Sequence, residues 1–204
     1  VRIDYVKGCA IRDTTQSNIK EAVEAARKAD LVILAVGGSS ARDFKTKYIN
    51  TGAATVDSEN SGILSDMECG EGFDRATLDL LGDQEKLIRA IAATEKPLVT
   101  VYIAGRPLNM NLASEVSDAL LTAWYPGEQG AQAMTEILFG EVNPSAKLPI
   151  TFPRNVGQLP LFYAAKPSGR GYGYVENDGS PLYPFGYGLS YTSFRMDDFR
   201  CEKK

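Results

Sequence analysis

Three short apolar segments, each followed by a loop rich in glycine or proline, restrict the fold of this chain more than any other feature. The segments are Leu31–Val36, Pro97–Ile103 and Ala119–Trp124. Continuous apolar runs of this length are typical of strands buried on both faces of a parallel sheet. The sequence therefore predicts an open sheet whose carboxyl-end loops begin after Val36, at Gly105 and at Pro126.

Helical patterns alternate with these segments. Apolar residues recur at helical spacing in Ser17–Lys28, where Ser17 is the expected N-cap, in Asp83–Ala93 and in Glu128–Phe139. Two weaker runs, Arg2–Lys7 and Lys147–Phe152, add possible strands. Strands that alternate with helices indicate βαβ units. We therefore expect an α/β fold, a three-layer α/β/α sandwich with a mostly parallel sheet of about five to six strands.

The length of 204 residues favours one large domain. We expect the sandwich core to occupy residues 1–155. Residues 156–204 are rich in glycine, proline and tyrosine and show no helical or strand period. We expect this segment to be an ordered tail that wraps over the domain and leads to a further domain absent from the chain.

Composition excludes several classes of function. The chain carries 22 basic and 26 acidic residues, hence a net charge of −4, and has no basic cluster, so we expect neither nucleic acid nor membrane as a partner. It has no histidine and three scattered cysteines. This argues against a zinc site and against any mechanism that needs an imidazole base. We expect no metal and no organic cofactor.

The stretch from Gly38 to Thr77 lacks a regular pattern and is rich in acids, and a loop of this length in a compact domain is usually functional or disordered. It is either a solvated acidic loop or a lining for a cleft that takes a polar substrate. Within it, Glu71 lies between two glycines, which let a backbone approach a ligand closely. The candidate acids among its acidic residues are Asp57, Glu59, Asp66, Glu68, Glu71 and Asp74.

Several strings, in order from about residue 30 to 194, resemble the second domain of family 3 glycoside hydrolases. The most distinctive is Glu71-Gly72-Phe73-Asp74-Arg75, followed by Leu78, Leu80, Gln84 and Leu87. The others are Gly105-Arg106-Pro107-Leu108, Trp124-Tyr125-Pro126-Gly127, Leu138-Phe139-Gly140-Glu141-Val142-Asn143-Pro144-Ser145, Lys147-Leu148-Pro149, Phe152-Pro153-Arg154, and Tyr183-Pro184-Phe185-Gly186-Tyr187-Gly188-Leu189-Ser190-Tyr191.

The resemblance implies that the active site is shared with a (β/α)8-type barrel domain of the same polypeptide, which donates the aspartate nucleophile. Glu71 matches the general acid/base position, and Glu68 is the second choice. Phe73 could supply an apolar wall that keeps Glu71 partly protonated. Asp74 and Arg75 are candidate substrate-binding residues, although Arg75 could instead pair with Asp74 and stabilise the loop.

Other conspicuous residues are expected to be structural. Arg106 would fix a tight turn after a strand, and Trp124 would belong to the core. The aromatic residues of the tail would pack against neighbouring parts of the full enzyme rather than stack on sugars. They are Tyr172, Tyr174, Tyr183, Phe185, Tyr187 and Tyr191.

The resemblance implies a retaining, exo-acting β-glycosidase, preferentially a β-glucosidase, whose substrate is an oligosaccharide or another β-glucoside. Nothing before Val1 provides a barrel, which needs about 250 residues, so the chain alone is expected to be inactive. A secreted or periplasmic bacterial location is also implied. Two alternatives remain: a noncatalytic carbohydrate-binding or scaffold domain, and a nucleotide-binding module whose phosphate loop would be Gly37-Gly38-Ser39-Ser40.

Overall fold

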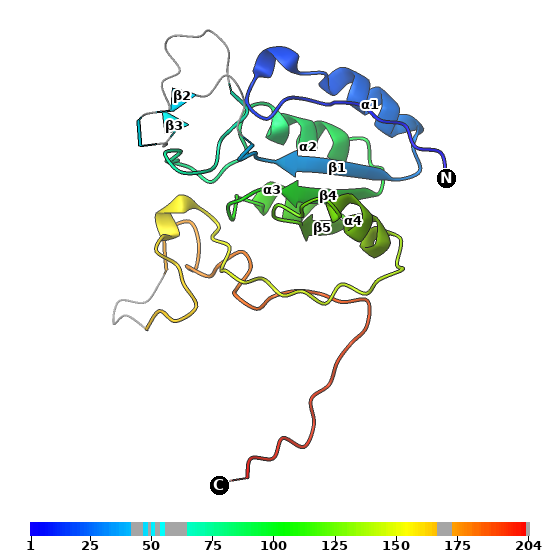
Figure 1. Cartoon of the computed structure of the whole chain (residues 1–204). Helices are drawn as coiled ribbons and strands as arrows, with labels where there is room; N and C mark the ends of the chain where they lie inside the picture. Colours follow the sequence, from blue (N-terminus) through cyan, green and yellow to red (C-terminus); the bar gives the residue numbers. More distant parts are fainter. Residues whose placement is uncertain (42–46, 49, 52–53, 56–64, 167–172, 203–204) are drawn as a thin grey trace.

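The computed structural model describes residues 1–41, 47–48, 50–51, 54–55, 65–166 and 173–202. Its main sheet is parallel, with the strand order β1 (Val32–Gly37), β4 (Leu98–Ile103), β5 (Ala119–Thr122) (Figure 1). β1 pairs with β4 from Val32–Leu98 to Gly37–Ile103, and Val99 of β4 lies beside Ala119 of β5. The three strongest apolar segments of the sequence are these strands, and the predicted α/β fold with a parallel sheet is confirmed.

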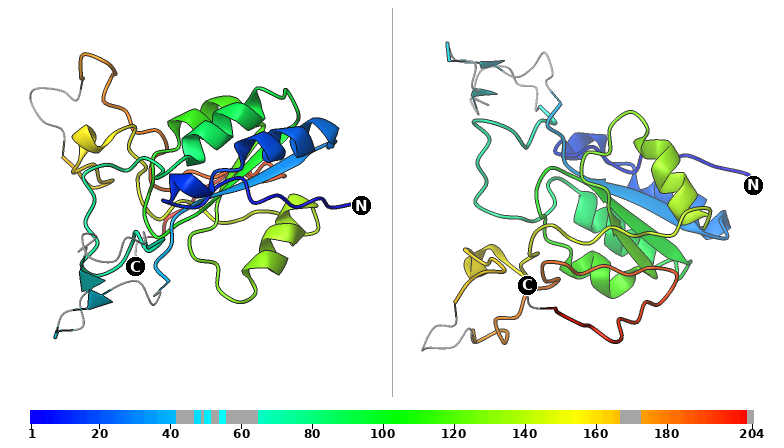
Figure 2. Two further views of the ribbon diagram at one scale, coloured as in Figure 1. Left: turned by 90° about the horizontal axis from the view of Figure 1, so that it is seen from above. Right: turned by 60° about the horizontal axis from the view of Figure 1, so that its bottom comes forward.

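Three helices cover one face of this sheet and a fourth lies on the other side (Figure 2). The covering helices are α1 (Ile19–Lys28), α2 (Gln84–Ala92) and α3 (Asn111–Val116), and the fourth is α4 (Gly130–Leu138). The predicted helices correspond to α1, α2 and α4, whereas α3 is too short to show a helical period in the sequence. Asn18 rather than Ser17 occupies the N-cap position of α1.

The core lies between the sheet and the helices α1, α2 and α3. Successive side chains of a strand point to opposite faces, so Leu34 and Val36 of β1 meet Ile88 of α2 in one buried cluster. On the opposite face Ile33 is 47% exposed. The expectation that β1 is buried on both faces is therefore wrong, because only the face toward α1 and α2 is covered along its length.

The parallel sheet has three strands in the described ranges, fewer than the five to six expected. Residues 2–7 form no strand, and Ile3 and Tyr5 are exposed. Residues 147–152 pair with the tail instead of the parallel sheet. Phe152 forms an antiparallel bridge with Tyr183, and the Leu148 amide donates to the Tyr187 carbonyl at 2.8 Å. Residues 147–152, which have a strand-like sequence, therefore pair with a part of the tail that shows no strand pattern.

The acidic stretch contains two short strands, β2 (Lys47–Tyr48) and β3 (Ala54–Thr55), which pair with each other antiparallel. The candidate acids Asp57 and Glu59 lie outside the described residues. Two short 3-10 helices, η1 (Thr14–Gln16) and η2 (Val156–Gln158), complete the secondary structure of the described chain.

The tail runs back along the domain, and its carboxyl-terminal end then extends away from the domain (Figure 1). Tyr183 of the tail bridges to Phe152 of the core, which is fully buried and whose ring lies 5.8 Å from the ring of Trp124. Trp124 packs against the main core, as expected. The division at residue 155 into core and tail stays a prediction. None of the helices in the described ranges is both long enough and apolar enough to cross a membrane.

Substitution of Gly140 by alanine is expected to cost about 1–2 kcal/mol of unfolding free energy, because L-residues are disfavoured in the left-handed region. Gly140 follows α4 with a φ of +79°, and nothing lies within 4 Å of the position a methyl group would take. The loss should therefore reflect backbone conformation alone. Urea unfolding of both proteins measures it, and an unchanged midpoint would show that Gly140 does not adopt this conformation.

Candidate functional site

The candidate site is a loop, residues 65–75, that lies at the carboxyl ends of β1 and β4. It is attached to the residue stretch after β1 through a parallel bridge between Ser39 and Met67. The amides of Glu68 and Cys69 both donate to the Ser39 carbonyl, at 2.9 and 3.2 Å. This is the edge of an open α/β sheet at which ligand sites are generally found.

Glu71 occupies the tip of a tight turn within this loop. The Phe73 amide donates to the Gly70 carbonyl at 3.1 Å and closes the turn. Gly72, the third residue of the turn, has a φ of +83°, a value that only glycine adopts readily. The side chain of Glu71 is exposed. The two glycines of the motif therefore form a turn that presents this carboxylate outward.

Phe73 anchors the turn from below. Its side chain is 6% exposed and packs with Met67 in a small apolar cluster of its own, apart from the main core. The ring thus belongs to the interior of the loop and does not form an open wall beside Glu71. Asp74, the next residue, is exposed.

Glu68 lies beneath the turn as a buried carboxylate between two guanidinium groups. Its Oε2 is 2.7 Å from Arg75 Nη1 and 3.8 Å from Arg106 Nε, and its side chain is 2% exposed. Its Oε1 has no hydrogen-bond partner among the described residues and faces Gly38, where a methyl group would lie only 1.9 Å away. A buried carboxylate needs such pairing to offset the loss of hydration.

The same arginines also hold the backbone of the loop. Arg106 donates through Nη2 to the carbonyls of Glu68, at 3.2 Å, and of Phe73. Arg75 donates to the Asp79 carbonyl. The expected ion pair between Arg75 and Asp74 is therefore wrong, because Arg75 is directed inward to Glu68. Arg106 does more than fix a turn, since it joins the loop after β4 to both ends of the Glu68–Phe73 segment.

A third arginine ties the amino-terminal end of the loop. Arg12 donates through Nη1 to the carbonyls of Ser65, at 3.1 Å, and Met67, at 3.5 Å. Three positive side chains from three separate segments thus converge on one short loop. The sequence placed Arg75 and Arg106 in separate motifs and gave no sign that Arg12 would join them. Arg106 had the clearest signal, because it comes three residues after a predicted buried strand, at the edge of the sheet where ligand sites are generally found.

Tyr125 lies beside Cys69 of the loop. Burial raises the pKa of the Tyr125 phenol, which also approaches Cys69. A methyl group at Gly105 would lie 2.6 Å from the ring of Tyr125 and 2.9 Å from Cys69 Sγ. Gly105 is therefore required for these side chains to meet. In the described ranges no three His, Cys, Asp or Glu side chains lie together in a way that could hold a metal ion.

The loop after β1 is not shaped as a phosphate loop. The Gly37 amide donates to Gln84 Oε1 at 2.7 Å, and the Gly38 amide donates to the Ile103 carbonyl at 2.9 Å. Phosphate loops present free amides, and the space beside Gly38 is filled by the carboxylate of Glu68. A nucleotide phosphate would meet occupied donors and a negative charge, so the nucleotide-binding alternative loses its support.

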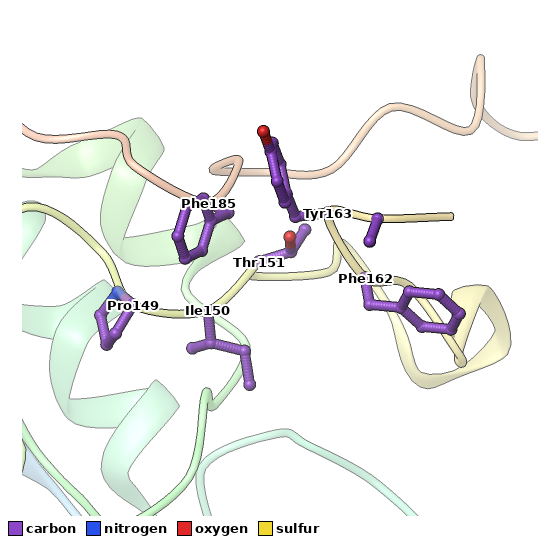
Figure 3. Close-up of a pocket in the computed structure, with 7 residues that line it drawn as sticks. Pro149, Ile150, Thr151, Phe162, Tyr163 and Phe185 are labelled. Atoms are coloured by element: carbon purple, nitrogen blue, oxygen red, sulfur yellow. The ribbon is translucent and has the colours of Figure 1, made fainter. Parts of the chain in front are cut away.

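One of the aromatic residues named in the tail, Phe185, borders an apolar pocket of about 240 Å³ (Figure 3). Within it the rings of Tyr163 and Phe185 are 4.8 Å apart. Tyr172 lies outside the described residues. No charged side chain lines the pocket, whose lining consists of Pro149, Ile150, Thr151, Phe162, Tyr163, Ala164 and Phe185.

Comparison with known proteins agrees with the motifs and the fold. The chain is 41% identical over 199 residues to a β-xylosidase from Formosa agariphila, and 38% identical over 193 residues to a periplasmic β-glucosidase from Salmonella typhimurium. These matches cover 96% and 90% of the chain, but only 24% and 22% of the two proteins. The chain thus spans about a quarter of the length of these relatives.

Solved structures give the same result. A β-glucosidase from Erythrobacter marinus superposes with a TM-score of 0.74 at 40% identity, over 93% of this chain and 26% of that one. A β-glucosidase from Listeria innocua, solved in complex with glucose, superposes with a TM-score of 0.69 at 28% identity, over 91% of this chain and 24% of that one. The family model described as the glycosyl hydrolase family 3 C-terminal domain matches residues 3–191. The chain therefore belongs to the C-terminal domain family of the family 3 glycosyl hydrolases.

Proposed function

We propose that this chain is the part of a retaining β-glycosidase that supplies its general acid/base, Glu71. The observation that carries the proposal is the contrast between two carboxylates of one loop. Glu71 is exposed at the tip of a turn, whereas Glu68 is buried and paired with Arg75. A proton donor must reach the oxygen of the leaving group, and of these two residues only Glu71 has access to a ligand.

The chemistry needs a second carboxylate. A retaining glycosidase holds two carboxyl groups roughly 5 to 5.5 Å apart, one as nucleophile and one as acid/base. We propose that an aspartate on a barrel domain of the same polypeptide attacks the anomeric carbon. Glu71 would protonate the departing oxygen and then take a proton from the water that releases the sugar from the aspartate. Contact with the barrel would also remove Glu71 from solvent, which favours its protonated form.

The proposed substrate is a β-glucoside, including short oligosaccharides, cleaved from its non-reducing end. Support comes from relatives named β-glucosidase, although others are named β-xylosidase. Glucose differs from xylose by one hydroxymethyl group, and the pocket that senses it would lie largely on the barrel. Rates on matched aryl β-glucosides and β-xylosides, measured with the full-length protein, would decide between the two sugars.

The central test compares the full-length protein with the 204-residue chain on aryl β-glucosides. We expect turnover by the full-length protein, with a first-formed product that retains the β configuration in NMR spectra. We expect no turnover by the chain alone, because it holds only one of the two carboxylates. Robust hydrolysis by the isolated chain would contradict the shared site, and an inverted product would contradict the two-step mechanism.

We also propose that the full-length protein works outside the bacterial cytoplasm, in the periplasm or after secretion. One relative is named a periplasmic β-glucosidase, and extracellular oligosaccharides are natural substrates for exo-acting enzymes. Fractionation of the source cells, with an antibody against this domain, would test this. Recovery of the protein in the cytoplasmic fraction alone would exclude it.

A further inference from the structure

We propose that Glu68 is the positioning residue of the acid/base loop: it holds the turn that carries Glu71 in place through Arg75 and Arg106, and takes no part in proton transfer itself. The inference deepens the proposed function and rests on Glu71 being the acid/base. It assigns a role to the carboxylate that the sequence left as the second candidate for the acid.

The first argument is the placement of Glu68. Its side chain is 2% exposed and its Oε2 is 2.7 Å from the guanidinium of Arg75. A group so enclosed cannot reach a glycosidic oxygen without dismantling the loop. The side chain instead occupies the centre of the loop, with residues of the loop on one side and Arg106, from the segment after β4, on the other.

The second argument is that the contacts of this network bracket the turn. Arg75 follows the turn and binds the Glu68 carboxylate, which precedes it. Arg106 binds the carbonyls of Glu68 and Phe73, one on each side of Glu71. Both ends of the Gly70–Phe73 turn are therefore fixed to the same pair of guanidinium groups, while Glu71 itself makes none of these contacts.

The third argument is that the Gly70–Phe73 turn needs contacts from outside to hold its conformation. Gly70 and Gly72 both have positive φ, +133° and +83°. Glycine loses more conformational freedom on ordering than other residues, so two glycines beside the proton donor would let it move widely unless contacts outside the turn hold it. A displacement of about 1 Å of a reacting group can cost on the order of 10² in rate.

Gly38 offers an independent way to disturb the network. A methyl group there would lie 1.9 Å from Glu68 Oε1 and 2.5 Å from Glu68 Cδ. Gly38 has no positive φ, so its backbone accepts alanine. Gly38→Ala would therefore push the carboxylate away from its place without changing any charge.

The test uses the full-length enzyme with Glu68→Gln, Gly38→Ala, Glu71→Gln and the double variant Glu68→Gln/Glu71→Gln. Glu115→Gln, at an exposed site on α3, is the matched control because it removes the same charge away from the loop. We measure kcat and KM on aryl β-glucosides with good and poor leaving groups, azide rescue, and thermal unfolding of each variant.

We expect Glu68→Gln and Gly38→Ala each to lower kcat on poor leaving groups by roughly 10- to 10²-fold, with KM changed less than kcat and no rescue by azide. We expect little further loss when Glu68→Gln is added to Glu71→Gln, since a residue that acts through another has no effect once that residue is gone. Glu115→Gln should behave as wild type.

Three results would overturn the inference, and they point to different errors. If Glu68→Gln and Gly38→Ala match Glu115→Gln, the network does not position the acid, although Glu71 keeps its role. If Glu68→Gln is rescued by azide while Glu71→Gln is normal, Glu68 is the acid and the proposed function of Glu71 fails. If the losses of the double variant multiply, Glu68 acts independently of Glu71. Should Glu68→Gln not fold, Gly38→Ala decides the matter alone.

Discussion

Replacement of Glu71 by glutamine in the full-length enzyme is expected to slow the hydrolysis of β-glucosides with poor leaving groups by about 10²- to 10⁴-fold, the range typical of a lost general acid. Glutamine keeps the size of the side chain but cannot donate the acidic proton. Because Glu71 is exposed at a turn and makes no ion pair in the described structure, the substitution should leave folding intact. The loss can then be attributed to chemistry.

The leaving group separates this loss from other causes. A substrate whose aglycone departs readily as an anion needs no proton for the first step, so its rate should fall less. Azide attacks the glycosyl-enzyme intermediate without a general base and should restore turnover, with a glycosyl azide as product. Glu115→Gln serves as the control for the lost charge. Equal rates for wild type and Glu71→Gln on all substrates would remove the proposed role and return this domain to the scaffold alternative.

Substitution of Gly37 by alanine should cost about 3–5 kcal/mol of unfolding free energy, the sum of backbone strain and a steric clash in the core. Gly37 ends β1 with a φ of +145°, and a methyl group there would lie 1.9 Å from the carbonyl oxygen of Ile103 on β4. That oxygen accepts the Gly38 amide. To relieve the contact, the carboxyl ends of β1 and β4 would have to separate beneath the candidate site.

Urea unfolding of the purified chain measures this effect, with Gly140→Ala as the matched control. Both glycines have positive φ, but only Gly37 faces a neighbouring strand. The difference between the two losses therefore isolates the clash from the conformational cost. Equal losses would mean that β1 and β4 can move apart freely at this point, and that Gly37 is required only for its backbone angles.

The sequence predicted the edge of the sheet at which the candidate site lies, because the relevant signals are local. A buried strand followed by glycine shows as a continuous apolar run, and the carboxyl ends of parallel strands meet at one edge. This placed the loop of Glu71 correctly. The interior of the loop was not predictable in the same way. Phe73 was expected to face a cleft and packs on Met67, and Arg75 was expected beside Asp74 and pairs with Glu68.

The parallel sheet has fewer strands in the described ranges than expected, for a related reason. Residues 2–7 and 147–152 have the composition of strands, but a strand needs a partner to pair with. Residues 147–152 pair with the tail near Tyr183 and Tyr187, and residues 2–7 form no strand or β-bridge in the described chain. Propensity for extended backbone is set by side chains close in sequence, whereas pairing depends on segments far away.

The sequence by itself determined the family, the α/β class, the order of the main elements and the glycine-flanked carboxylate, because each depends on residues within a few positions of one another. Only the tertiary structure decided which of two acids is accessible. Glu68 is buried by Gly38, Arg75 and Arg106, which reach it from three segments separated by up to 68 positions in the chain. Because these segments meet only in the folded chain, only the structure shows that Glu68 is buried and paired with arginine whereas Glu71 is exposed.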